Sequence, residues 1–290
     1  MSNPSRFLII DGYPKSSRDQ FGEVGMRLAW ELYRDMVRKY VPDAEYDVWF
    51  ASDAPTEGPA DVPSYDGILW PGCNLTVYHD NDPRVTNQLD LAQRAYEAGI
   101  PQFGTCWGIQ IAVYAAGGAV GPNPKGREMG IGRKIRLTDA GRAHPMFRGK
   151  PPVYSHFVSH DDEVKELPPG ATLLAGNDFS RVQAAEVRHR NGVFWGLQYH
   201  PEYDLHEMAR LIVAREEKLV RQGLFLGHED LVRYVDRLEA LAGDPGRKDL
   251  RWQLGIDEDI LSDEIRQCEF INWLGAQVNA SKSRSISKQP

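Results

Sequence analysis

One cysteine lies in a sequence context that suits nucleophilic catalysis. Cys106 is the middle residue of a Gly-x-Cys-x-Gly pentapeptide at 104–108, between a strand-like stretch at 100–103 and a helix-like stretch at 109–116. A sharp turn between a strand and a helix is the setting of a nucleophile elbow, and glycines on both sides leave room for that turn. The start of a helix also favours the thiolate form of a cysteine. A lone cysteine is often just a small buried residue, so the pentapeptide alone leaves both interpretations open.

A histidine and a carboxylate further along the chain could activate this thiol. His200 and Glu202 follow the apolar run at 193–195 and are separated by Pro201. Residues two apart in an extended chain leave the same face, so both side chains can meet at the end of a strand. A histidine that accepts the thiol proton and is held by a carboxylate is the Cys-His-acid form of a catalytic triad.

Together these motifs resemble the class I (triad-type) glutamine amidotransferases, whose domains carry Gly-x-Cys-x-Gly-x-Gln and, later, His-Pro-Glu. Here the motifs read GTCWGIQ at 104–110 and HPE at 200–202. A third block at 154–164, followed by LPPG at 167–170, is similar to the amidotransferase domain of GMP synthetases. The resemblance covers roughly residues 5–205. It implies an α/β fold with a doubly wound, mostly parallel, flavodoxin-like sheet.

The resemblance also implies roles for individual residues. Three would form the triad: Cys106, His200 and Glu202. Backbone N–H groups would hold the oxyanion, and further residues would position glutamine, with the block around 159–160 holding its α-amino and α-carboxyl ends. These oxyanion and substrate residues are Gly72, Trp107, Gln110, Ser159 and His160. The implied reaction hydrolyses the side-chain amide of glutamine through a glutamyl thioester and requires neither a metal nor an organic cofactor.

Composition excludes several other classes of protein. The chain has 290 residues, 41% of them hydrophobic, which suits one domain of about 200 residues with an addition. A net charge of −7 gives no electrostatic support for nucleic-acid binding. Three cysteines without metal-ligand spacing predict neither a disulfide framework nor a zinc site, and His79, Asp80 and Asp82 lack the spacing of a metal site. The absence of a signal peptide and of a long apolar stretch predicts a cytoplasmic protein without a membrane partner.

The hydrophobic pattern predicts alternating strands and helices. Continuous apolar runs predict buried parallel strands, and 3.6-residue spacing predicts helices. A loop is expected at 11–20, and a change to short strands and turns at 131–195. We expect a catalytic domain at 1–205, a helical extension at 206–280 and a disordered tail at 281–290. The expected strands are 7–10, 46–50, 67–70, 100–103, 134–137, 171–174, 182–187 and 193–195, and the expected helices are 21–36, 85–96, 109–116, 205–223, 231–238 and 261–278.

Three functions remain open at this point. Because the chain has no Gly-rich phosphate loop, it cannot itself be an ATP-dependent synthetase. The favoured hypothesis is a glutaminase that supplies ammonia to a separate synthetase. The alternatives are a stand-alone hydrolase of a γ-glutamyl amide or peptide, and an inactive regulatory or binding protein on the same fold. The extension is expected to pack on the catalytic domain and to cover part of the active-site rim or form a homodimer contact.

Overall fold

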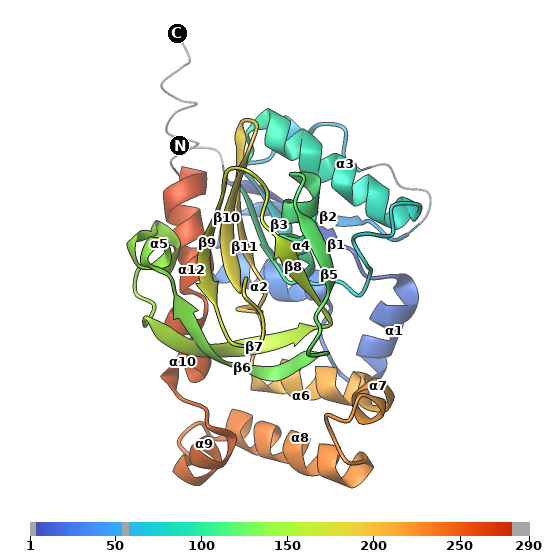
Figure 1. Ribbon diagram of the computed structural model, residues 1–290, viewed down its shortest axis with the longest axis vertical. Helices are drawn as coiled ribbons and strands as arrows, with labels where there is room; N and C mark the ends of the chain where they lie inside the picture. The colour runs from blue at the N-terminus through green and yellow to red at the C-terminus, as the bar shows by residue number, and fades with distance from the viewer. Residues whose placement is uncertain (1–3, 54–57, 280–290) are drawn as a thin grey trace.

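The computed structural model describes residues 4–53 and 58–279, so the tail expected at 281–290 lies outside the described residues. A nine-stranded sheet runs through the molecule in the order β2-β1-β3-β4-β11-β10-β9-β6-β7 (Figure 1). Helices pack on both of its faces, which confirms the expected α/β class.

One half of the sheet is parallel. Each strand pairs in parallel with its neighbour across the order β2-β1-β3-β4-β11. Their apolar runs are buried from both sides, as expected for parallel strands covered by helices. Carboxyl ends of parallel strands meet at one edge, so residues just after β4 and β11 come together there. The strands are β1 (Arg6–Asp11), β2 (Glu45–Phe50), β3 (Gly67–Trp70), β4 (Gln102–Thr105) and β11 (Gly192–Leu197).

The other half of the sheet is antiparallel, and a separate two-stranded sheet, β5-β8, lies beside it. Short strands with alternating burial fit this arrangement, as β6 shows. These strands are β5 (Ala119–Pro122), β6 (Glu128–Leu137), β7 (Val153–His160), β8 (Asp162–Glu166), β9 (Ala171–Gly176) and β10 (Ala184–His189).

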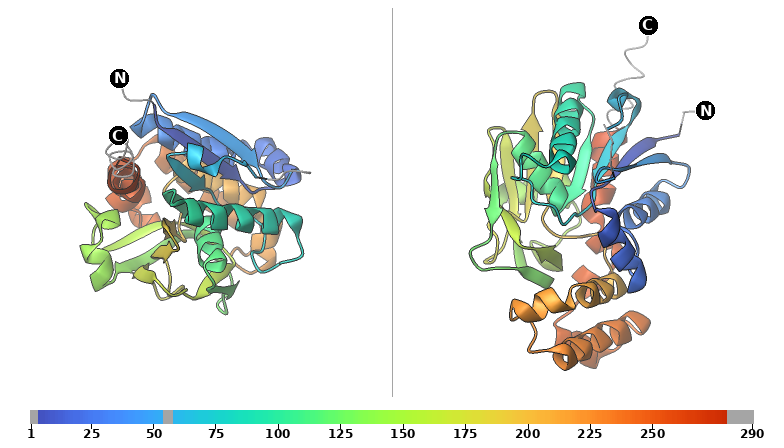
Figure 2. Two further views of the ribbon diagram at one scale, coloured as in Figure 1. Left: turned by 90° about the horizontal axis from the view of Figure 1, so that it is seen from above. Right: turned by 90° about the vertical axis from the view of Figure 1, so that its right-hand side faces the viewer.

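Two apolar clusters cover the two faces of the large sheet. Helices α3 (Pro83–Ala98) and α4 (Trp107–Ala115) contribute to one of them. Helices α2 (Ala29–Tyr40) and α12 (Cys268–Trp273) contribute to the other (Figure 2). A segment close to the end of the described chain therefore belongs to the same core as the N-terminal strands.

A third apolar cluster joins the C-terminal helices to β7 and to the N-terminal helices. In Figure 1 helices α6 to α9 form a layer beyond the end of the sheet. No helix in the described ranges is long and apolar enough to cross a membrane. The remaining helical elements are α1 (Lys15–Glu23), α5 (Asp139–Ala143), α6 (Leu205–Ala214), α7 (Glu216–Arg221), α8 (His228–Gly243), α9 (Lys248–Leu254), α10 (Glu258–Leu261), α11 (Asp263–Arg266), two 3-10 turns (Val62–Ser64 and Pro145–Phe147) and a π-helical turn (Leu274–Val278).

The structure corrects two of the expected elements. The loop expected at 11–20 is largely helix α1, which ends before Gly25; the φ of 76° at this glycine separates α1 from α2. The single helix expected at 205–223 is two helices, because Arg215 leaves helical geometry with φ −114° and ψ 12°. An amphipathic pattern continues across such a break, so periodicity alone does not reveal it.

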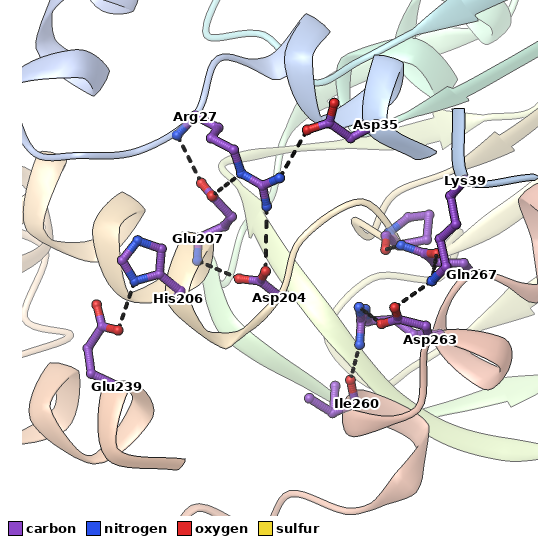
Figure 3. A network of polar contacts seen from close by, with 12 residues as sticks. Arg27, Asp35, Lys39, Asp204, His206, Glu207, Glu239, Ile260, Asp263 and Gln267 are labelled. Atoms are coloured by element: carbon purple, nitrogen blue, oxygen red, sulfur yellow. Dashed lines mark hydrogen bonds and ion pairs between the residues drawn. The ribbon is translucent and has the colours of Figure 1, made fainter. Parts of the chain in front are cut away.

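Ion pairs attach the C-terminal segment to the sheet domain (Figure 3). The Arg27 guanidinium, at the start of α2, lies 2.6 Å from the buried Glu207 carboxylate and 3.5 Å from Asp204. Lys39 of α2 pairs with Asp263 of α11 at 2.5 Å. These contacts hold α6 and α11 against the same helix.

A fully buried ion pair lies deeper in the same junction. Lys150 Nζ is 3.0 Å from an oxygen of Glu269 in α12, and both side chains are inaccessible to solvent. Lys150 also donates to the carbonyl of Ile265 at 2.8 Å, and the Tyr199 hydroxyl donates to Glu269 at 2.6 Å. Each charge therefore has several polar partners, which a buried ion pair requires.

Candidate active site

Cys106 lies in a strained turn between β4 and α4. Its φ of 51° and ψ of −95° are unusual for a residue with a side chain. A Cβ on Gly108 would lie 2.6 Å from the Trp70 carbonyl oxygen, and one on Gly104 would lie 2.7 Å from Trp70 Cβ. Both glycines are therefore needed for the turn to approach β3. The turn is further fixed because the Cys106 N–H donates to the Leu197 carbonyl at 2.7 Å.

His200 and Glu202 form a buried pair just after β11. His200 Nδ1 lies 2.7 Å from Glu202 Oε1, which is the contact that the His-Pro-Glu spacing predicts. The imidazole stacks on Tyr203 with 4.2 Å between ring centroids and 7° between planes. The N–H of His200 donates to the Phe157 carbonyl at 2.9 Å. Backbone, ring and carboxylate contacts together fix the orientation of the imidazole.

Two further hydroxyls support the carboxylate. Thr105 Oγ1 donates to Glu202 Oε1 at 3.0 Å, and the Tyr33 hydroxyl donates to Thr105 Oγ1 at 2.9 Å. Thr105 is a variable position of the pentapeptide and Tyr33 lies in α2 without any motif. Sequence reasoning therefore missed this chain of hydrogen bonds.

The surroundings of His200 favour its charged form. Burial by itself lowers the pKa of His200, but the negative charge of Glu202 and the adjacent Cys106 outweigh burial and raise the pKa to about 9. The imidazole Nε2 is buried and has no hydrogen-bond partner among the described residues. At neutral pH the ring is therefore an imidazolium whose second N–H is available to a reacting group.

Gly72 lies against both His200 and Cys106. A Cβ at this position would be 2.8 Å from His200 Cε1 and 3.7 Å from Cys106 Cβ, so a side chain here would displace the imidazole. Trp107 follows Cys106 and its indole Nε1 donates to Gln88 at 2.8 Å. With the indole occupied in this way, the backbone N–H is the group that Trp107 could offer to an oxyanion.

A cavity of about 180 Å³ opens next to Cys106. Among the predicted residues Gln110, Ser159 and His160 also line it. The Ser159 carbonyl lies 3.7 Å from Cys106 Sγ, and Gln110 Nε2 lies 3.5 Å from the Asp162 carbonyl. Both ring nitrogens of His160 are occupied, one by Glu128 at 2.9 Å and one by the Asp162 carbonyl at 2.9 Å. The His160 side chain thus shapes the wall of the cavity.

A sequence profile of known proteins decides the family. The profile described as "Glutamine amidotransferase class-I" matches residues 43–218, which include the elbow and the His-Pro-Glu motif. The chain belongs to the class-I glutamine amidotransferase family.

Relatives of this amidotransferase include free-standing hydrolases and components of synthetases. A γ-glutamyl-L-1-hydroxyisopropylamide hydrolase from a Pseudomonas species is 31% identical over 97% of this chain and 96% of its own length. A glutamine-hydrolysing subunit of GMP synthase from Ignicoccus hospitalis is 29% identical over 57% of this chain and 81% of its own length. A glutamine amidotransferase structure from Thermotoga maritima superimposes with a TM-score of 0.66 at 18% identity, over 96% of this chain and 99% of that one, and supports the fold.

Three cations that the motifs did not predict also line the cavity of this amidotransferase: Arg127, Arg215 and Lys218. Arg127 precedes β6, and sequence reasoning assigned it no chemistry. Arg215 and Lys218 lie in the C-terminal segment beyond the last motif. No local pattern marks them, because their position depends on how α6 and α7 pack against the sheet.

The other cysteines lack the environment of a nucleophile. Cys73 lines the same cavity and Cys268 is buried in α12. Burial raises the pKa of both thiols, so their thiolate forms are disfavoured. Within the described ranges no group of three His, Cys, Asp or Glu side chains is placed to hold a metal ion.

Proposed function

We propose that this amidotransferase is a stand-alone hydrolase of γ-glutamyl amides, with Cys106 as nucleophile and His200 and Glu202 as its base and orienting carboxylate. The observation that carries the proposal is the elbow cysteine beside a buried His–Glu pair, at the edge of a small cavity. The Pseudomonas hydrolase supports the stand-alone form, because the similarity extends through the C-terminal helices that follow the family profile.

The first half of the proposed reaction forms a thioester. The Cys106 thiolate attacks the γ-carbonyl carbon of the substrate, and the carbonyl electron pair moves to oxygen. The backbone N–H groups of Gly72 and Trp107 hold this oxyanion; one such donor contributes about 3–4 kcal/mol to other hydrolases. The His200 imidazolium gives its Nε2 proton to the amide nitrogen as the C–N bond breaks. The amine leaves and a γ-glutamyl thioester remains on Cys106.

The second half of the proposed reaction restores the enzyme. His200, now neutral, takes a proton from water, and the hydroxide attacks the thioester carbonyl. When the C–S bond breaks, glutamate and the Cys106 thiolate are released and His200 is again an imidazolium. Glu202 keeps Nδ1 protonated throughout, because its carboxylate accepts from this nitrogen.

A second candidate function is supported by the synthetase relative. A glutaminase that delivers ammonia to a separate synthetase would use the same chemistry with L-glutamine. The GMP synthase subunit from Ignicoccus hospitalis favours it, since that protein is a separate chain of the kind that this hypothesis requires.

Substrate preference separates the two candidates. With purified protein and no partner, we expect kcat/KM for a γ-glutamyl N-alkylamide to exceed that for L-glutamine by about tenfold or more, because a fitted alkyl group adds binding energy in the transition state. Amine and ammonia release measure the two reactions. Hydrolysis of glutamine alone, increased by a synthetase partner, would favour the glutaminase. Turnover of neither substrate would leave an inactive protein on this fold.

The pH dependence should report the imidazolium. The raised pKa of His200 predicts that kcat/KM falls as the pH rises through about 9, because the ring then loses the proton that the leaving nitrogen needs. In Glu202→Gln the negative charge is absent, so this alkaline limb should move to lower pH. A limb that stays at the same pH in Glu202→Gln would show that another group controls it.

A further inference from the structure

Arg215 enters the cavity from the break between two helices. It lies between the end of α6 at Ala214 and the start of α7 at Glu216, and its backbone is not helical. The break directs a residue of the C-terminal segment into the wall of the cavity that contains Cys106. In an unbroken helix from 205 to 223 this position would follow the helical repeat instead.

Carboxylates neutralise the other two cations of this wall. Arg127, whose side chain is 3% exposed, pairs with Asp161 and donates to Ser159 Oγ at 3.0 Å. Lys218 Nζ lies 2.6 Å from the same Asp161. The charges of both are therefore balanced within the protein.

Arg215 has no such partner. Among the described residues it forms no ion pair, and its one hydrogen bond is a 3.5 Å contact with the Tyr13 hydroxyl. The Nε atoms of Arg215 and Arg127 are both buried and make no hydrogen bond. An unmade hydrogen bond at a buried charged donor is costly, so these groups would gain from an acceptor in the cavity.

The balance of charge identifies the kind of acceptor. Cations outnumber carboxylates three to two in the cavity wall, the carboxylates being Asp161 and Asp162. Burial and the nearby charge of Arg215 both lower the pKa of Arg127, so the two guanidinium groups repel each other. An anion between them would remove this repulsion. A guanidinium binds a carboxylate through two parallel N–H donors, which makes a carboxylate the matching ligand.

We propose that Arg215, with Arg127 behind it, binds the α-carboxylate of the γ-glutamyl group. The inference rests on the proposed function. The cavity holds Cys106 and has a volume of about 180 Å³, so the anion that binds there belongs to the part of the substrate joined to the reacting carbonyl. The C-terminal segment thereby supplies a specificity residue to an active site whose other predicted residues all precede it.

Substrates with and without this carboxylate test the assignment. In Arg215→Met, kcat/KM for L-glutamine or a γ-glutamyl N-alkylamide should fall about 10- to 100-fold, the range for a hydrogen bond to a charged group. Hydrolysis of 4-aminobutanamide, which is glutamine without its α-carboxylate, should stay at the wild-type rate. Arg215→Lys, which keeps the charge without the paired donors, should fall between the two. Arg221→Met, on the exposed side of α7, is the matched control.

Equal losses with both substrates, or no loss with either, would overturn the assignment. A loss found only with substrates that carry a carboxylate on the leaving group would place the anion on that group instead. Thermal unfolding of each variant identifies any loss caused by misfolding. Titration of the wild type and Arg215→Met with L-glutamate and 4-aminobutyrate adds a test without turnover: only glutamate binding should weaken. This arm remains informative if no γ-glutamyl amide is hydrolysed, which would reject the proposed function alone.

Discussion

Cys106→Ala should lower kcat for γ-glutamyl amide hydrolysis by roughly 10⁴- to 10⁶-fold, the range for removing the nucleophile of a triad. Without sulfur no thioester forms, and the remaining His200–Glu202 pair has no group to activate. The fold should persist, because alanine occupies less space than cysteine and keeps the packing of the elbow glycines against Trp70. Amine release and circular dichroism measure the two effects.

Chemical labelling provides an independent check on the same residue. A diazo-ketone analogue of glutamine should modify Cys106, and mass spectrometry should find the adduct there. Cys268→Ala, which changes a buried thiol of α12, is the matched control and should retain both activity and labelling. An adduct on Cys73 would reject Cys106 as the nucleophile.

Lys150→Met should lower the free energy of unfolding by about 3–5 kcal/mol, because it leaves the Glu269 carboxylate buried without its cation. The effect should be large because neither side chain has access to solvent, so water cannot replace the lost partner. The neighbouring Tyr199 hydroxyl alone cannot neutralise a charge.

Urea unfolding followed by tryptophan fluorescence measures this change. The matched control is Lys39→Met, which removes an ion pair to the same C-terminal segment but in a half-exposed position. It should cost about 0–1 kcal/mol, as exposed pairs do. Adding Glu269→Gln to Lys150→Met should restore part of the stability, because the unpaired charge is then gone. Equal costs for Lys150→Met and Lys39→Met would show that burial of the pair is unimportant.

Local sequence predicted the parts of the site that local geometry builds. The elbow depends on two glycines near Cys106, and the His200–Glu202 contact depends on spacing at a strand end, so both are visible within a few residues. Parallel strands were equally clear, because strands buried on both faces require continuous apolar runs. The catalytic roles of these residues stay predictions until the variants are measured.

Packing determines the parts that the sequence did not reveal. Tyr33 reaches the site only because α2 lies under β4, and its hydroxyl has no motif to mark it. Arg215 was placed within one continuous helix, since the apolar stripe of α6 and α7 does not record the change in direction between them. Helix α1 was missed because its polar sequence buries little apart from Phe21.

The contact between the first strand and the last helix has a consequence for biosynthesis. Phe7 of β1 packs on Trp273 of α12 with 6.1 Å between ring centroids, and Trp273 also fills the space beside Gly67. During translation one face of β1 must therefore stay uncovered until nearly the whole chain has left the ribosome. Contacts so far apart in sequence slow folding and expose apolar surface meanwhile. We expect nascent chains stalled before α12 to be bound by chaperones.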